Sequence, residues 1–148
     1  EELRMRLCHG LYATALLAMA ATGGAGTAWA QAGLMTGGAT KLPPITLSSG
    51  KPLAEAPYEL EAGKYYRIDI VSDGSAELAI AGPEFFRNVW VNEVVINDIE
   101  VRPLGVHSLE FDDEGTATIS FITIRPGTFE LRIPGTTADS QAAVFVVK

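Results

Sequence analysis

Residues Thr116–Ile124 read TATISFITI, and residues Tyr65–Val71 read YYRIDIV. In both stretches apolar residues recur at every second position, which is the period of a β-strand with one buried face. The positions predicted to face inward are Ala117, Ile119 and Phe121, with Thr123 next in the series, and Tyr66, Ile68 and Ile70, opposite Arg67 and Asp69. Two half-buried strands of this kind predict a sheet whose apolar face needs a second layer.

The same period continues on both sides of these two stretches. Ile45 and Leu47 alternate with polar residues, and further strands are expected at 58–61, 77–81, 89–96, 106–111, 128–133 and 142–147. Turn signals separate them, including Asp73-Gly74 and Pro126-Gly127. No long amphipathic helix is expected, and residues 85–89 form one helical turn at most. Seven or eight short strands of this kind predict an all-β fold, an antiparallel Greek-key β-sandwich or barrel.

The first thirty residues have the pattern of a cleaved signal peptide. Arg4 and Arg6 precede an apolar run at 11–21, and Ala28-Trp29-Ala30 fits a cleavage site before Gln31. The run is shorter than the roughly 20 apolar residues that span a bilayer. We therefore expect export to the periplasm, or secretion, with no stable membrane span after cleavage; the alternative is an uncleaved anchor.

Cleavage would remove Cys8 and leave an acidic domain without cysteine. Residues 31–44 are predicted to be a flexible lead-in, and residues 45–148 a single domain. The whole chain has 11 basic and 18 acidic residues, a net charge of −7. Nucleic acid requires a basic surface, so it is excluded as a partner. An acidic surface steers basic partners, and a basic envelope protein is the expected kind of partner.

From about residue 45 to the end, four segments resemble a known family in their order. Residues 59–70 (ELEAGKYYRIDI), 82–89 (GPEFFRNV), 125–131 (RPGTFEL) and 143–147 (AVFVV) are similar to segments of bacterial periplasmic cupredoxin-like domains, which have the plastocyanin or azurin type of fold. The resemblance implies a cupredoxin-like domain over residues 45–148. It also implies where the ligands of a type 1 copper site would stand.

Those ligand positions hold other residues in this chain. The resemblance places the first copper histidine at Leu78 and the copper cysteine at Ile133. It places the second histidine within 134–139, where the sequence has none. The axial ligand falls near Gln141. A type 1 site needs two histidines and a thiolate, and an axial glutamine cannot replace them. We therefore expect no copper cofactor, with Leu78 and Ile133 close together and filling the vacated pocket.

Two other groups of polar residues are candidate sites. His107 is the one histidine after residue 30, and it is expected on a strand as a structural or surface residue rather than a metal ligand or general base. The acidic run Glu110, Asp112, Asp113 and Glu114 is expected to be a solvated hairpin turn, because it lacks the spacing of a calcium-binding loop.

One aromatic segment is the candidate partner-binding site. Phe85, Phe86, Arg87 and Trp90 are expected to plug one end of the sandwich, with one phenylalanine inward and the tryptophan outward. Trp, Phe and Arg are also favoured at the centres of interfaces. Phe86, Arg87 and Trp90 are thus the candidate contact residues.

The sequence therefore favours a binding or accessory module for another envelope protein, without a redox copper site. No catalytic motif is found, so the chain is not expected to be an enzyme. The alternative is a copper-binding or electron-transfer protein with an unconventional site, for which His107, Met35 and the acidic run are the only candidate ligands.

Overall fold

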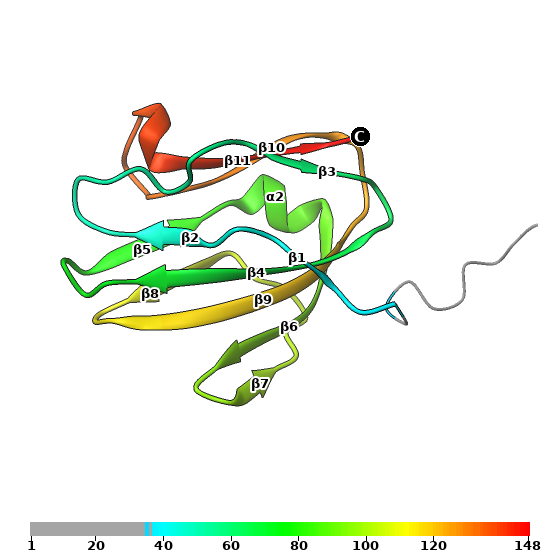
Figure 1. The fold of residues 1–148 in the computed structure, drawn as a ribbon, viewed down its shortest axis with the longest axis horizontal. Helices are drawn as coiled ribbons and strands as arrows, with labels where there is room; N and C mark the ends of the chain where they lie inside the picture. The colour runs from blue at the N-terminus through cyan, green and yellow to red at the C-terminus, as the bar shows by residue number, and fades with distance from the viewer. Residues whose placement is uncertain (1–34, 36) are drawn as a thin grey trace, which may run out of the picture. The chain divides into compact units, whose positions relative to one another are not determined.

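The computed structural model describes residue 35 and residues 37–148, which form two packed β-sheets (Figure 1). The predicted signal peptide, with Cys8, lies outside the described residues. Sheet A contains β1 (Thr40–Lys41), β2 (Ile45–Leu47), β4 (Tyr65–Ser72), β9 (Gly115–Thr123), β6 (Val89–Ile96) and β7 (Ile99–Val101). Sheet B contains β3 (Tyr58–Leu60), β11 (Ala142–Val147), β10 (Gly127–Arg132), β5 (Leu78–Ala81) and β8 (Ser108–Phe111). The predicted all-β class is confirmed.

The sheets are mixed rather than wholly antiparallel. Strands β1 and β2 both run parallel to β4, and β3 runs parallel to β11. Parallel neighbours need a crossover between them. Here the chain leaves β2 in sheet A, adds β3 to sheet B and then returns to sheet A as β4. Alternating hydrophobicity detects such strands but gives no information about their direction.

The predicted inward faces of β4 and β9 are confirmed. Tyr66, Ile68 and Ile70 are at most 7% exposed. Opposite them across the β4–β9 ladder, Phe121, Ile119 and Ala117 are at most 2% exposed. Strand β9 pairs with β4 on one side and β6 on the other, so it is the central strand of sheet A. The inward-facing apolar residues of β9 form the sheet A side of the hydrophobic core.

A short helix covers one end of this core. Helix α2 (Pro83–Arg87) lies between the two sheets (Figure 1), and Phe85 and Phe86 are 1% and 9% exposed. The Phe85 ring centroid lies 5.3 Å from that of Phe121 in β9 and 4.5 Å from that of Phe145 in β11. Phe85 therefore joins the two sheets through aromatic contacts. The expected plug is present, with both phenylalanines buried.

The ordered domain begins before residue 45. Thr40–Lys41 pair with Tyr66–Arg67 as β1, and Leu42 is only 9% exposed. These residues belong to the predicted flexible lead-in 31–44. A two-residue strand is too short to show periodicity, so the sequence pattern does not reveal it.

Strand β7 is also absent from the sequence prediction. It is joined to β6 by a two-residue turn at Asn97 and Asp98, whose φ angles are 48° and 63°. Asn and Asp tolerate this left-handed region better than other non-glycine residues, and it is the region that a tight hairpin turn requires. The pair Asn97-Asp98 was the available signal for this hairpin.

Replacing Phe85 with alanine should lower the free energy of unfolding by about 3–5 kcal/mol, because it removes the ring that contacts both sheets. Ile124→Ala is the matched control, since Ile124 is 55% exposed and its truncation should change stability by less than about 0.5 kcal/mol. Urea denaturation followed by circular dichroism measures both values. Equal losses for the two variants would contradict the assigned role of Phe85.

The turn between β4 and β5 is held by a carboxylate. Asp73 accepts a hydrogen bond from the Ser48 hydroxyl at 2.6 Å and one from the Ser75 backbone N–H at 3.0 Å. These hydrogen bonds, that of Ser48 first, lower the pKa of Asp73 from 3.8 to about 2. A depressed pKa in the folded state contributes stability above the unfolded value, and that stability is lost as the pH falls.

Thermal stability should therefore decrease as the pH falls from about 4 toward about 2, in part because Asp73 becomes protonated. Asp73→Asn should flatten this part of the profile, and Ser48→Ala should move it to higher pH. Melting temperatures measured at intervals across this range provide the test. A profile of Asp73→Asn that is parallel to the wild type would contradict this assignment.

Candidate functional site

The outer face of sheet A carries a group of apolar side chains near one end. Tyr65, Ile122 and Trp90 form one cross-strand row over β4, β9 and β6. Ile122 is 8% exposed, whereas Trp90 is 49% exposed and Tyr65 is half-buried. Ile124, two residues further along the chain, is 55% exposed. We call Tyr65, Trp90, Ile122 and Ile124 the Trp90 surface.

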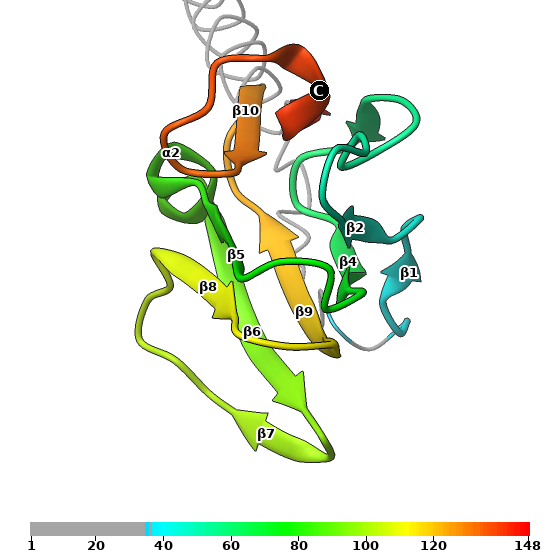
Figure 2. The same ribbon diagram turned by 90° about the vertical axis from the view of Figure 1, so that its left-hand side faces the viewer.

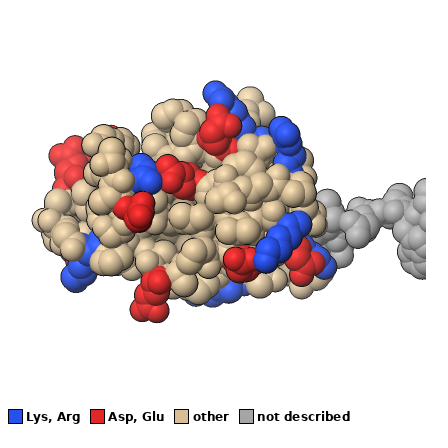
Figure 3. Space-filling model, turned by 90° about the horizontal axis from the view of Figure 1, so that it is seen from above, with Lys and Arg blue, Asp and Glu red and all other residues tan. Residues whose placement is uncertain are grey.

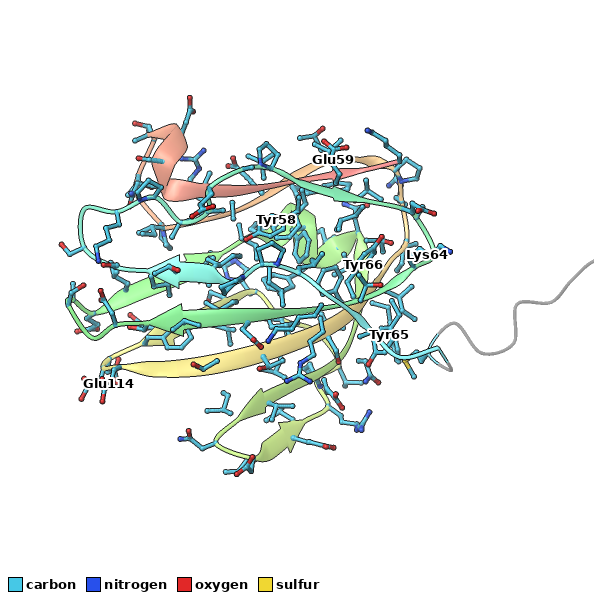
Figure 4. The ribbon with its side chains drawn as sticks, in the orientation of Figure 1. Tyr58, Glu59, Lys64, Tyr65, Tyr66 and Glu114 are labelled. Atoms are coloured by element: carbon cyan, nitrogen blue, oxygen red, sulfur yellow. The ribbon has the colours of Figure 1, made fainter. Side chains whose placement is uncertain are left out.

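The neighbouring tyrosines of β4 point in opposite directions. Figure 4 shows Tyr65 and Tyr66 on opposite sides of the strand, with Tyr66 between the sheets. The Tyr66 ring centroid lies 6.0 Å from that of Phe121, and its hydroxyl accepts a hydrogen bond from the Glu61 backbone N–H at 2.9 Å. The strand pleat thus assigns one tyrosine to the core and the other to the Trp90 surface.

A β-bulge in β6 places a polar network beside the Trp90 surface. Val91 pairs with Phe121 and Glu93 pairs with Ser120, which leaves Asn92 as the extra residue. The Asn92 amide donates hydrogen bonds to the Tyr65 hydroxyl at 3.1 Å and the Ser120 hydroxyl at 3.4 Å. The bulge in β6 therefore fixes the position of Tyr65 in β4, across the intervening strand β9.

Arg102 extends this network toward β7. Its guanidinium donates to the Asn92 side-chain oxygen at 3.0 Å. It also forms ion pairs with Glu93 at 3.1 Å and with Glu100 at 3.3 Å. A guanidinium held by three side chains is fixed in its orientation on the surface.

Charged and hydroxyl groups occupy another part of the outer face. Asp69 accepts a hydrogen bond from the Thr118 hydroxyl at 2.7 Å and pairs with Lys41 at 3.0 Å. The Thr118 hydrogen bond, together with Lys41, lowers the pKa of Asp69. The outer face therefore has an apolar aromatic part and a polar part.

The structure separates the three predicted contact residues. Trp90 is exposed, and Arg87 is exposed in an ion pair with Glu84 at 2.6 Å. Phe86 is 9% exposed and belongs to the core, so its side chain is not available to a partner. The sequence did not single out Asn92 and Arg102, because a bulge and a long-range side-chain contact leave no periodic signal.

Two of the three positions that the resemblance assigns to copper ligands are neighbours in the fold. The Ile133 backbone N–H donates to the Gln141 carbonyl at 3.1 Å, so these two residues are neighbours. The Gln141 side-chain amide donates to the Lys51 carbonyl at 3.1 Å. Leu78 is half-buried at the start of β5, and both Leu78 and Ile133 pack against the core.

These side chains do not fit a type 1 copper ion. Leucine and isoleucine carry no nitrogen or sulfur donor, and the Gln141 side-chain oxygen alone cannot replace two histidines and a thiolate. Ile133 is instead 9% exposed and part of the hydrophobic core. Its burial gives that position a structural role.

The candidate ligands of the alternative copper site are exposed. His107 lies in the loop before β8 rather than on a strand, and its carbonyl accepts a hydrogen bond from the Gly82 N–H at 3.3 Å. Met35 is 39% exposed. Asp112, Asp113 and Glu114 of the acidic run form the β8–β9 turn, as predicted, whereas Glu110 lies within β8. Figure 4 shows Glu114 at the end of the sandwich. In residue 35 and residues 37–148, no three His, Cys, Asp or Glu side chains converge.

A groove of about 770 Å³ lies beside the loop between β2 and β3. Prolines 43, 44, 52 and 57 line it together with Tyr58. The Tyr58 hydroxyl donates to the Pro44 carbonyl at 3.3 Å, and burial raises the pKa of Tyr58 to about 12. The tyrosine therefore has a structural role in the wall of the groove, and no periodic pattern in the sequence indicates this groove.

Comparison with solved structures identifies the fold. The chain is similar to copper nitrite reductase from Nitrosomonas europaea, with a TM-score of 0.51, 17% identity and 64% of this chain covered. It is also similar to a multicopper oxidase from Pseudomonas thermotolerans, with a TM-score of 0.53, 14% identity and 74% of this chain covered. No protein-family model and no curated protein matches the chain.

Both of these proteins have cupredoxin folds, so the chain has a cupredoxin-like fold, as the sequence resemblance predicted. The matches cover only 33% of the nitrite reductase chain and 30% of the oxidase chain. The chain thus spans about a third of the length of these two proteins. None of the helices in the described part of the chain has the length and hydrophobicity needed to cross a bilayer.

Ile133→Ala should lower the free energy of unfolding by about 2–5 kcal/mol, because it leaves a cavity in the core. Leu78→Ala should cost less, since Leu78 is half-buried and the site can relax into solvent. Denaturant unfolding of both variants gives the comparison. A smaller loss for Ile133→Ala than for Leu78→Ala would contradict the structural role of Ile133.

Proposed function

We propose that this domain is a recognition module of the cell envelope, a cupredoxin-like domain that binds another protein through the Trp90 surface and carries no redox copper. The observation that carries the proposal is the exposure of Trp90 beside Ile122 and Ile124 on the uncovered face of sheet A. Exposed tryptophan with apolar neighbours and an oriented arginine is typical of interface centres.

Three features support this function over catalysis or electron transfer. The face that carries Trp90 is held by the Asn92 network, which pre-organises it. The positions that the resemblance gives to copper ligands carry Leu78 and Ile133, which cannot bind the ion. The predicted export signal would bring the domain to the envelope, where we propose that its partner lies.

The net charge of the chain indicates which kind of partner we propose. The chain has a net charge of −7, which would favour a basic partner at low ionic strength. Figure 3 shows acidic and basic side chains interspersed on the face seen from above, over sheet B. We propose that charge steers the encounter and that the apolar Trp90 surface supplies most of the binding energy.

Trp90→Ala should abolish capture of the partner, because a tryptophan at the centre of an interface contributes about 2 kcal/mol or more, a change of about 30-fold in Kd. The tagged chain is used to capture proteins from an envelope extract, which are quantified by mass spectrometry. Leu104→Ala is the matched control, since Leu104 is a fully exposed apolar residue outside the Trp90 surface. The same proteins captured by both variants would contradict the proposal.

Copper titration tests the second part of the proposal, that the domain carries no redox copper. After incubation with Cu²⁺ and dialysis, elemental analysis should find less than one copper per chain, and no intense visible band should appear. Stoichiometric copper with such a band would instead support the alternative function, a copper-binding or electron-transfer protein with an unconventional site. His107→Ala would then identify the ligand.

A further inference from the structure

Strand β7 forms an open edge of sheet A. It pairs with β6 through Ile96–Ile99, Val95–Glu100 and Val94–Val101, and it is the last strand in the order of the sheet. All three of its residues are exposed. Figure 2 shows the β6–β7 hairpin extending past the other strands. Open edges with exposed apolar residues are uncommon in monomeric proteins, because they pair readily with another strand.

The apolar residues of the hairpin lie on the inner face of sheet A. Val94, which pairs with Val101, is 4% exposed, and Ala117, which pairs with Ile96, is 2% exposed. Cross-strand partners share a face, so Ile99 and Val101 point to the core side of the sheet. They are nevertheless 66% and 45% exposed. Sheet B does not cover this part of the inner face.

The turn geometry determines which backbone groups of β7 face outward. A two-residue turn with positive φ at both positions closes on a hydrogen-bonded pair, here Ile96 and Ile99. Hydrogen-bonded and non-hydrogen-bonded pairs alternate along an antiparallel ladder. Glu100 is therefore in a non-hydrogen-bonded pair with Val95, and its N–H and C=O point away from β6.

We propose that β7 pairs antiparallel with β7 of a second copy of this chain, about a two-fold axis at Glu100. The Glu100 N–H of each copy donates to the Glu100 carbonyl of the other. In this register Ile99 of one copy is opposite Val101 of the other, which joins the two uncovered apolar faces. The interface is isologous, as in most symmetric dimers.

Charge complementarity favours a second copy in this register. Asp98 of one copy comes opposite Arg102 of the other, so two pairs of opposite charge flank the axis. The two Glu100 carboxylates meet at the axis, where each is already paired with Arg102 of its own copy at 3.3 Å. Pro103 follows directly, two residues after the end of β7 at Val101, and a proline there cannot extend the strand's ladder with β6, so the pairing ends at this point. The proposal does not depend on the function of the Trp90 surface.

Sedimentation velocity of the purified chain over a range of concentrations tests this pairing. The wild type should form a reversible dimer. Glu100→Pro removes the outward N–H and leaves the β6 pairing intact, so it should raise the dimer Kd by about tenfold or more. Glu100→Gln is the matched control, since it keeps the N–H and should still dimerise.

Ile99→Lys is the second variant, and it should also weaken the dimer because it places a charge in the apolar contact. Ile99 is 66% exposed, so this variant should fold even if Glu100→Pro does not. Trp90→Ala should dimerise like the wild type, which separates this proposal from the proposed function. A monomer at all concentrations, including one that binds only a different protein, would overturn the proposal, as would dimerisation unaffected by Ile99→Lys.

Discussion

The inward row of β9 is the interaction on which the rest of the structure depends. Strand β9 is hydrogen-bonded to β4 and β6, and its residues Ile119, Phe121 and Thr123 are at most 1% exposed. Phe121 contacts the Phe85 ring, which in turn contacts Phe145 of sheet B. One row of side chains thus joins the central strand of sheet A to the helix and the opposite sheet.

The opposite side of the same strands presents the candidate site. Because side chains alternate along a strand, burying Phe121 places Ile122 on the outer face, between Tyr65 and Trp90. The bulge at Asn92 then adds an extra residue whose amide holds the Tyr65 hydroxyl. The core and the proposed contact surface are therefore two faces of one sheet. A change in the core that shifts β9 would also move the Trp90 surface.

Much of the fold could be predicted from the sequence, because half-buried strands leave a period of two. The inward faces of β4 and β9 follow directly from the alternation in YYRIDIV and TATISFITI. Short or irregular elements could not be predicted in this way. Strand β1 has only two residues. Residues 89–96 were correctly expected to form a strand, but the bulge at Asn92 that interrupts its alternation was not expected.

The candidate site was predicted in part. Trp90 was correctly expected to point outward, since it alternates with Val89 and Val91, which are buried on the opposite face of the strand. Phe86 was expected to contact a partner but is buried, because helix α2 directs both of its phenylalanines into the space between the sheets. The roles of Tyr65 and Arg102 depend on contacts across 27 and 10 residues of sequence, and a local pattern carries no information about such contacts.

Hydroxyl-radical footprinting with mass spectrometry tests most directly whether a partner binds the Trp90 surface. Free in solution, the exposed indole of Trp90 should be oxidised readily, as should Leu104. In the complex with the captured partner, Trp90 and Tyr65 should be protected while oxidation of Leu104 is unchanged. Unchanged oxidation of Trp90 together with protection of another face would contradict the account.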